Sequence, residues 1–198
     1  KGDATAALEL AEDVCRNSDK ERSLHYLINA LEVKAACLLR LGRFDDTIES
    51  LRQLPPLFLE DTVLFDKADQ NVTYGILGIA YLRKADYEDA VSAADEAIAH
   101  LSGVLPDNYG YFWGYAGPAE VYLGLWEKGY RTVGLRKRIR DACKKMSSFA
   151  RIFPVGRPRV ELLHGIALYQ EGKTAPAFRS WQKSIEISEA LKMPYETG

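Results

Sequence analysis

Residues 74–97 read YGILGIAYLRKADYEDAVSAADEA, and this stretch decides the fold class. Apolar side chains recur at helical spacing on both sides of Ala85, which predicts two helices, over about 66–82 and 86–101, joined by a tight turn. Gly78 and Ala90 are small enough to let the two helices approach closely. Three aromatic side chains would fill the space around that contact: Tyr74, Tyr81 and Tyr87. The stretch therefore predicts a helical hairpin.

A small residue, followed five positions later by a second small residue or Thr, recurs along the whole chain. The pairs are Gly2/Ala7, Gly42/Thr47, Ala85/Ala90, Gly129/Gly134 and Gly172/Ala177. Their first members are 40, 43, 44 and 43 residues apart. Self-similarity at such a period predicts a solenoid, in which each hairpin buries its apolar face against its neighbours. We expect the first residue of each pair in the turn and the second on the second helix of the hairpin.

The remaining segments extend this pattern into one helical-repeat domain over residues 1–198. We expect a half hairpin over 1–18 and hairpins over 23–54, 63–101, 111–152 and 157–193. After the hairpin over 23–54, Pro55 and Pro56 should end its second helix, because proline cannot donate to the helix ladder. No segment alternates with period two, so the class is all-α. Because the first repeat is half present, we expect the chain to be a piece of a longer protein.

Composition narrows the class of protein. The 198 residues carry a net charge of −2, with 47% hydrophobic and 27% charged residues, which is typical of a globular chain. No apolar run approaches the ~20 residues that a membrane helix needs, and the first residues lack the order of a signal peptide. Cys15, Cys37 and Cys143 are far apart and form no C-x-x-C pair, which favours buried thiols in a reducing compartment. We therefore expect a cytoplasmic protein.

The motif Tyr74-x2-Leu77-Gly78-x2-Tyr81, followed by Tyr87, Ala90, Ala94 and Ala97, resembles the tetratricopeptide repeat. Weaker copies begin at Leu31, Ala119 and Gly165. The resemblance implies a right-handed superhelix of antiparallel helix hairpins that binds protein or peptide partners. The period of about 43 residues exceeds the 34 of that family, so longer helices or links must absorb the difference.

A second resemblance lies toward the end of the chain. Its residues are Arg151-Ile152-Phe153-Pro154, Arg157-Pro158-Arg159, Gly165, Gly172, Ala177, Trp181 and Met193-Pro194-Tyr195-Glu196. In this order they resemble the C-terminal helical-repeat region of multidomain regulators that carry an NTPase module, often with an adenylate or guanylate cyclase. The resemblance implies a scaffold or sensor role in signal transduction, with partners that include other domains of the same polypeptide.

Catalytic and cofactor motifs are not apparent. Gly172-Lys173-Thr174 resembles the end of a phosphate loop, but Ala167 occupies the position of the required first glycine and lies within a predicted helix. His25, His100 and His164 have no partner at metal-ligand spacing. No nucleophile elbow is present. We therefore predict no enzymatic activity, no metal and no cofactor within these residues.

Two surfaces stand out from the background. The first is aromatic, with seven aromatic residues within 18 positions: Tyr109, Tyr111, Phe112, Trp113, Tyr115, Tyr122 and Trp126. They either fill the core around nearby glycines or line a partner groove, since Trp and Tyr are enriched in binding hot spots.

The second surface is basic. Residues 131–159 carry ten Lys or Arg residues and a single acid, Asp141. The apolar stripe of this helix leaves four cations on the opposite side: Arg136, Lys137, Arg140 and Lys144. This basic face is a solvated surface, docks to an acidic protein, or neutralises the phosphates of a nucleic acid or another anionic ligand.

These observations predict a non-catalytic protein-interaction and regulatory module of a larger cytoplasmic signalling protein. Partner contacts are expected on the concave first helices, from Tyr74, Tyr81, Tyr111, Trp113, Tyr115 and Arg159. The best repeat has Val72, Ile76 and Ile79 at the positions where some tetratricopeptide domains carry the polar residues that clamp a carboxylate, which argues against that mode of recognition. The alternative function is binding of nucleic acid or an anionic ligand through residues 131–159, although the net charge does not favour nucleic acid. Nothing indicates a membrane partner.

Overall fold

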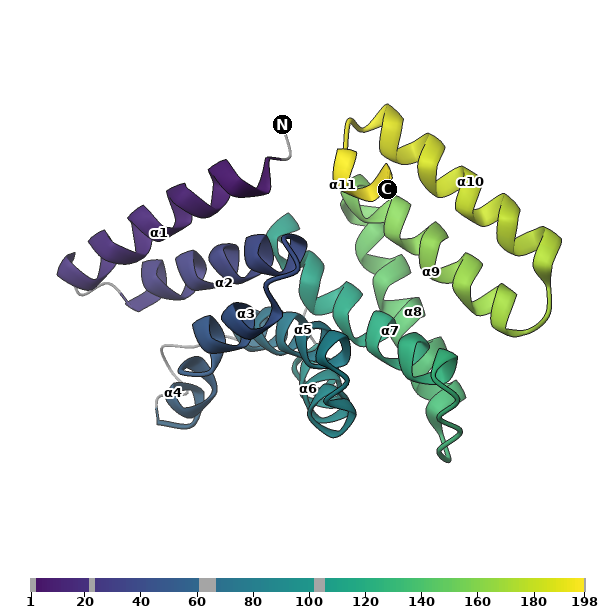
Figure 1. The fold of residues 1–198 in the computed structure, drawn as a ribbon, viewed down its shortest axis with the longest axis horizontal. Coiled ribbons are helices and arrows are strands. Elements are labelled where there is room, and N and C mark those ends of the chain that lie inside the picture. The colour runs from purple at the N-terminus through teal and green to yellow at the C-terminus, as the bar shows by residue number, and fades with distance from the viewer. Residues whose placement is uncertain (1–2, 22–23, 61–66, 102–105, 198) are drawn as a thin grey trace.

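A computed structural model describes residues 3–21, 24–60, 67–101 and 106–197, and these residues form helices and turns without a strand (Figure 1). The long helices are α1 (Ala4–Glu21), α2 (Leu24–Arg40), α5 (Lys67–Lys84), α6 (Tyr87–His100), α7 (Phe112–Glu127), α8 (Leu135–Ile152), α9 (Arg157–Gln170) and α10 (Thr174–Ala190). The shorter ones are α3 (Phe44–Leu51), α4 (Leu54–Glu60), α11 (Pro194–Thr197) and the 3-10 turns η1 (Tyr109–Tyr111) and η2 (Pro154–Gly156). The predicted hairpin starts at residues 23 and 63 lie outside the described residues.

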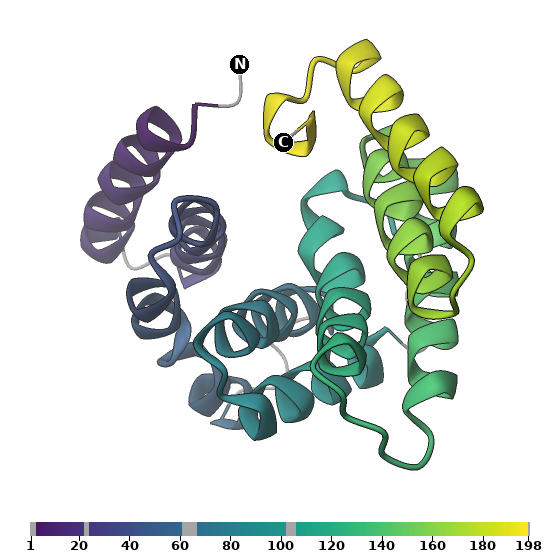
Figure 2. The same cartoon turned by 45° about the vertical axis from the view of Figure 1, so that its right-hand side comes forward.

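The helices pack as consecutive antiparallel pairs that follow an arc (Figure 2). Helix α2 pairs with α3, α5 with α6, α7 with α8, and α9 with α10, while α1 packs on α2. Each first helix also packs against the next, α2 on α5, α5 on α7 and α7 on α9. The chain is therefore an all-α helical-repeat solenoid, as the sequence period predicted.

The recurring residue of the sequence marks a repeated turn with a left-handed residue. Gly42, Ala85, Gly129 and Gly172 have φ of +73°, +64°, +90° and +79°. At each turn the N–H of the following residue bonds a carbonyl five positions back, at 2.9–3.0 Å, as in Arg43 to Leu38. This Schellman arrangement satisfies carbonyls that the helix end leaves without donors. The turn is therefore set by local backbone chemistry, which explains why a small residue recurs at each one.

Two predicted details of the turns are wrong. Gly134 does not lie on a second helix, because it has φ +86° and precedes α8, which begins at Leu135. The turn after α7 is extended to residues 128–134, and the buried small residues of α8 are Ala142 and Ala150 instead. Pro55 and Pro56 do not end a helix, because they lie in the first turn of α4. Proline is tolerated there, since its missing N–H would have no helical partner.

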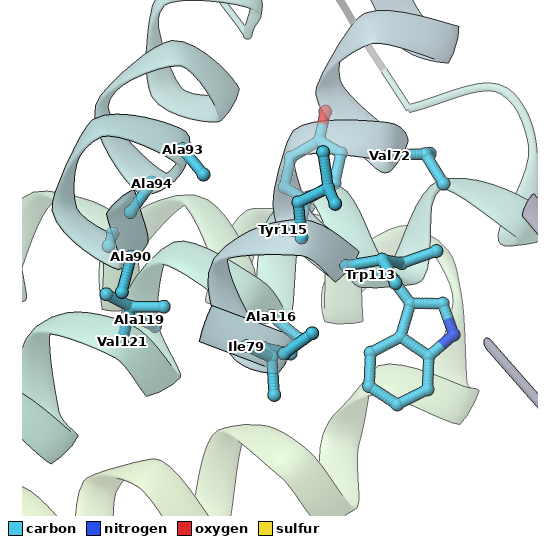
Figure 3. Close-up of a cluster of buried hydrophobic side chains, with 14 of the residues drawn as sticks. Val72, Ile79, Ala90, Ala93, Ala94, Trp113, Tyr115, Ala116, Ala119 and Val121 are labelled. Carbon is cyan, nitrogen blue, oxygen red and sulfur yellow. The ribbon is translucent and has the colours of Figure 1, made fainter. Parts of the chain in front are cut away.

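Helices α5 and α7 cross with their backbones in contact. A Cβ at Gly75 would lie 2.4 Å from the carbonyl oxygen of Trp113, and one at Gly117 would lie 2.3 Å from the carbonyl oxygen of Gly75. Alanines of α6 and α7 fill the neighbouring space, among them Ala90 and Ala119, both fully buried (Figure 3). Backbone contacts backbone at this crossing, so the start of α7 is held rigidly against α5.

Beside this crossing, a buried side-chain amide supplies a hydrogen bond that the backbone of α7 lacks. Pro118 lies inside α7 and has no N–H to offer the carbonyl of Gly114, four residues earlier. Asn71 of α5, 1% exposed, donates from Nδ2 to that carbonyl at 3.0 Å and to the carbonyl of Ala97 at 2.9 Å. The Ala97 carbonyl lies at the end of α6, where the N–H of Leu101 bonds Ile98 instead. One side chain thus joins α5, α6 and α7.

Candidate functional site

A cavity of about 420 Å³ lies on the inner side of the arc, between α2, the start of α7 and α11. We call it the central cavity. Its walls come from Asn29, Glu32 and Arg40 of α2, from residues 108–113, and from Met193 and Glu196 at the end of the chain. Figure 2 shows α11 near α1 and α2 across the opening of the arc. The superhelix therefore brings both ends of the described chain to one site.

The indole of Trp113 forms part of the wall of the central cavity and lies near two guanidinium groups. Arg40 lies over its ring at 5.3 Å from the centroid, and Arg159 at 5.9 Å. Arg159 also lies 5.7 Å from the ring centroid of Phe112. Cations at these distances are attracted to the faces of aromatic rings. The cavity thus combines an aromatic wall with charged groups of both signs, the cation Arg40 and the acids Glu32 and Glu196.

A chain of buried ion pairs runs beneath this wall. Arg159 donates from Nη1 to Glu120 at 2.7 Å and from Nη2 and Nε to the two carboxylate oxygens of Glu196 at 2.9 and 3.1 Å. Glu120 is also paired with Arg83, whose side chain is half-exposed at the end of the chain of ion pairs. The side chains of Arg159 and Glu196 are only 7% and 3% exposed. Removal of one partner from such a buried pair is strongly destabilising, because it leaves an uncompensated charge.

This ion pair fixes α11 at the edge of the central cavity. The hydroxyl of Ser188 in α10 donates to the backbone carbonyl of Glu196 at 3.2 Å, and the N–H of Met193 bonds Ser188 through a further left-handed turn at Lys192. The end of the chain is therefore tied both to α9, through Arg159, and to α10. Its position sets one wall of the cavity.

The structure separates the predicted contact residues into two groups. Tyr111 and Trp113 line the central cavity, and Arg159 lies directly behind them. Tyr115 is 4% exposed and packs on Phe149 with ring centroids 5.1 Å apart, and Tyr74 stacks on His100 at 5.9 Å. Neither of these, nor Tyr81, borders the central cavity. Partner contact through any of the six stays a prediction.

The aromatic cluster divides in the same way between core and groove. Phe112, Trp113, Tyr115 and Tyr122 are buried, whereas Tyr111 is half-buried and Tyr109 is 70% exposed. Burial and a hydrogen bond to Asp95, at 2.6 Å, raise the pKa of Tyr122 far above its usual range. The cluster is therefore mostly core, with its first residues exposed at the cavity.

The predicted basic face is divided as well. Arg136 and Arg140 line a second cavity of about 820 Å³ between α7, α8 and α9, which we call the outer cavity. Lys137 and Lys144 are on the same helix but do not line it. Apolar side chains, including Met146 and Leu163, form its floor, and Trp126 stands at one side.

Burial suppresses the reactivity of the cysteine thiols. It raises the pKa of Cys143, which lines the outer cavity, to about 11. Burial also raises the pKa of Cys15 and of Cys37. A thiol needs a lowered pKa to act as a nucleophile at neutral pH, so these three are poor candidates for covalent chemistry.

The sequence assigned no role to Asn71 or Glu120, and it placed Glu196 in a motif without indicating its partner. Asn71 could have been found from Pro118, because a proline within a helix pattern leaves a carbonyl that some donor must satisfy. The ion pairs of Arg159 join residues that are 37 and 39 positions apart in the sequence. Motifs and helical periodicity do not indicate pairs at such separations.

Among the residues that the structure describes, no three His, Cys, Asp or Glu side chains are placed to hold a metal ion. Within the same residues, no helix is both long and apolar enough to cross a membrane.

Comparison with known proteins bears on the fold alone. No family model matches the chain, and no curated protein matches it. Among solved structures, it is similar to a variant of a putative kinesin light chain from Podospora anserina with nearly identical TPR-like repeats. The TM-score is 0.55 at 14% sequence identity, over 96% of this chain and 89% of that one. The likeness supports a TPR-like helical-repeat fold, in agreement with the resemblance found in the sequence.

Proposed function

We propose that this chain is a non-catalytic protein-interaction module that holds a segment of a partner protein in the central cavity. The observation that carries the proposal is the composition of that cavity, where Tyr109, Tyr111 and Trp113 lie beside the cation Arg40, while the paired Arg159 lies behind the wall. Aromatic and Arg side chains are the residues most enriched in interface hot spots. Tyr109 is the most exposed of the three, so a partner could bury much of its ring.

The rigidity of the site supports the same proposal. The start of α7 rests backbone-to-backbone on α5, and α11 is fixed by the bidentate pair of Glu196 and Arg159. A preformed site loses little conformational entropy when it binds, which favours affinity. Such a preformed site suits recognition of an extended or helical segment of a partner.

The finer proposal is a regulatory sensor module of a larger cytoplasmic signalling protein. It rests on the resemblance of residues 151–196 to the helical-repeat region of NTPase-containing regulators. The full reading frame tests it: we expect an NTPase or another signalling domain in the same polypeptide. A frame that encodes only these residues would contradict it.

Photocrosslinking in cells tests the binding site itself. A photoreactive phenylalanine analogue replaces Tyr109, at the cavity, or Val133, which is fully exposed in the turn after α7. We expect a discrete protein adduct from position 109, lost when Arg40→Glu is added, and none from position 133. The same products from both positions would show that the cavity has no selective partner.

A further inference from the structure

We propose that the outer cavity is a second interaction site, which binds an acidic amphipathic helix of a partner protein. This inference shares with the proposed function only the premise that the chain binds proteins. It concerns a different surface, formed by α7, α8 and α9, so each site can be tested while the other is intact.

The floor of the outer cavity has the pattern of a helix-binding groove. On α8, Ile139, Cys143 and Met146 line it at positions i, i+4 and i+7. On α9, three more side chains line it at positions i, i+3 and i+7: Val160, Leu163 and Ala167. Each row is about 10 Å long, since a helix rises 1.5 Å per residue. Ile139, Cys143, Val160 and Ala167 are half-buried, while Met146 and Leu163 are buried beneath them. Apolar rows of this length match two turns of an amphipathic helix, whose anchors recur at the same spacing.

Charge at the rim selects an acidic partner. Arg136 and Arg140 of α8 and Lys173 of the turn before α10 stand around the opening. Glu171 is the one acid among the lining residues, and it is paired with Lys173 at 2.7 Å. Lys173 also lowers the pKa of the Glu171 carboxyl, chiefly by hydrogen bonding. The two arginines therefore dominate the rim and would face the carboxylates of the partner.

Most cations of α8 do not line the outer cavity, and this allows the cavity to be tested separately from the charge of the helix. Helix α8 carries seven Lys or Arg residues and one acid, in a chain whose net charge is −2. Arg138 points to α6, where it pairs with Asp95 at 3.0 Å, whereas Lys137 and Lys144 are exposed and do not line the cavity. A ligand that is bound only by the overall charge of α8 would contact all of these cations. A ligand in the cavity would use Arg136 and Arg140.

A designed peptide tests the proposal by fluorescence anisotropy with the whole chain. The probe is an 18-residue labelled helix with Leu at i, i+3 and i+7 and Glu on the other face; its control has the same composition in scrambled order. We expect saturable binding of the probe, weakened at least 10-fold by Arg136→Glu with Arg140→Glu. The matched pair Lys137→Glu with Lys144→Glu makes the same charge change outside the cavity and should weaken it less than 3-fold.

Ala167→Phe fills the floor without changing charge and should also weaken the probe at least 10-fold, while circular dichroism confirms that each variant is folded. Tyr109→Ala should leave probe affinity unchanged, which separates this site from the central cavity. Three results would overturn the proposal: no binding of the probe at 100 µM, equal binding of the scrambled peptide, or equal losses in the two charge-reversed pairs. A single-stranded oligonucleotide that binds more tightly than the probe, with the same dependence on Arg136 and Arg140, would assign the cavity to nucleic acid instead.

Discussion

Gly117→Ala tests whether α5 and α7 cross with their backbones in contact. The added Cβ would lie 2.3 Å from the carbonyl oxygen of Gly75 and 2.8 Å from its Cα, where ordinary contacts are 3.4–4 Å. Both neighbours are backbone atoms of a helix, so the helices must separate by about 1 Å, a distance that disturbs close-packed side chains on both. We therefore expect the substitution to destabilise the fold.

The magnitude follows from two opposing terms. Overpacking of a core costs about 1–3 kcal/mol, and a rigid backbone neighbour places this site at the upper end. Alanine gains about 1 kcal/mol over glycine from helix propensity. The net loss is about 2 kcal/mol, which for a chain of this size corresponds to a fall in Tm of about 4–8 °C.

Gly124→Ala, in the same helix, is the matched control. Its Cβ would meet Cδ2 of Leu82 at 2.7 Å, the flexible end of a side chain that can rotate away. The gain in propensity should then offset the contact, so we expect Tm to change by less than about 2 °C. Thermal unfolding followed by circular dichroism at 222 nm measures both variants. A Gly117→Ala protein as stable as the parent, or two variants destabilised equally, would refute the backbone contact.

Three other substitutions test the turn, the buried amide and the buried ion pair. Ala85→Gly should stabilise the chain by about 0.5–1 kcal/mol in urea unfolding, because Ala85 has φ +64° and glycine adopts that conformation without strain. Asn71→Leu should destabilise it by about 3 kcal/mol in the same assay, because two buried carbonyls lose their donor; a loss below 1 kcal/mol would mean that they find other partners. Glu196→Gln keeps the shape of the side chain but removes the negative charge that pairs with Arg159. Amide hydrogen exchange over 188–197 should therefore accelerate, while exchange in α5 is unchanged. Equal protection of 188–197 in parent and variant would show that the ion pair does not hold α11.

The turns of the solenoid could be predicted from the sequence because their cause is local. A left-handed residue at each turn is required by the five or six residues around it, so Gly42 and Gly172 have the same role 130 positions apart. Gly134 was assigned to the wrong place because the turn before α8 is longer than the others. The period alone does not show whether extra residues lengthen a turn or a helix.

The candidate site was only partly predictable, because it depends on the curvature of the whole arc. Trp113 and Tyr111 were found as members of an aromatic cluster, yet their neighbour Tyr115 points into the core. One turn of helix changes the surroundings of a side chain completely, and a cluster in sequence does not show which members face inward. Glu196 could not be assigned, since its partner Arg159 lies on another helix.

The affinity of the partner recovered by crosslinking, measured by calorimetry for paired tyrosine variants, tests the central claim most directly. Tyr109 lies at the central cavity, whereas Tyr169, 55% exposed, lies on α9 with its ring against Trp181, and neither substitution removes a buried side chain. If the chain binds its partner through the central cavity, Tyr109→Ala should weaken binding at least 10-fold and Tyr169→Ala less than 2-fold. Equal affinities of the two variants would contradict the assignment of the central cavity as the interaction site.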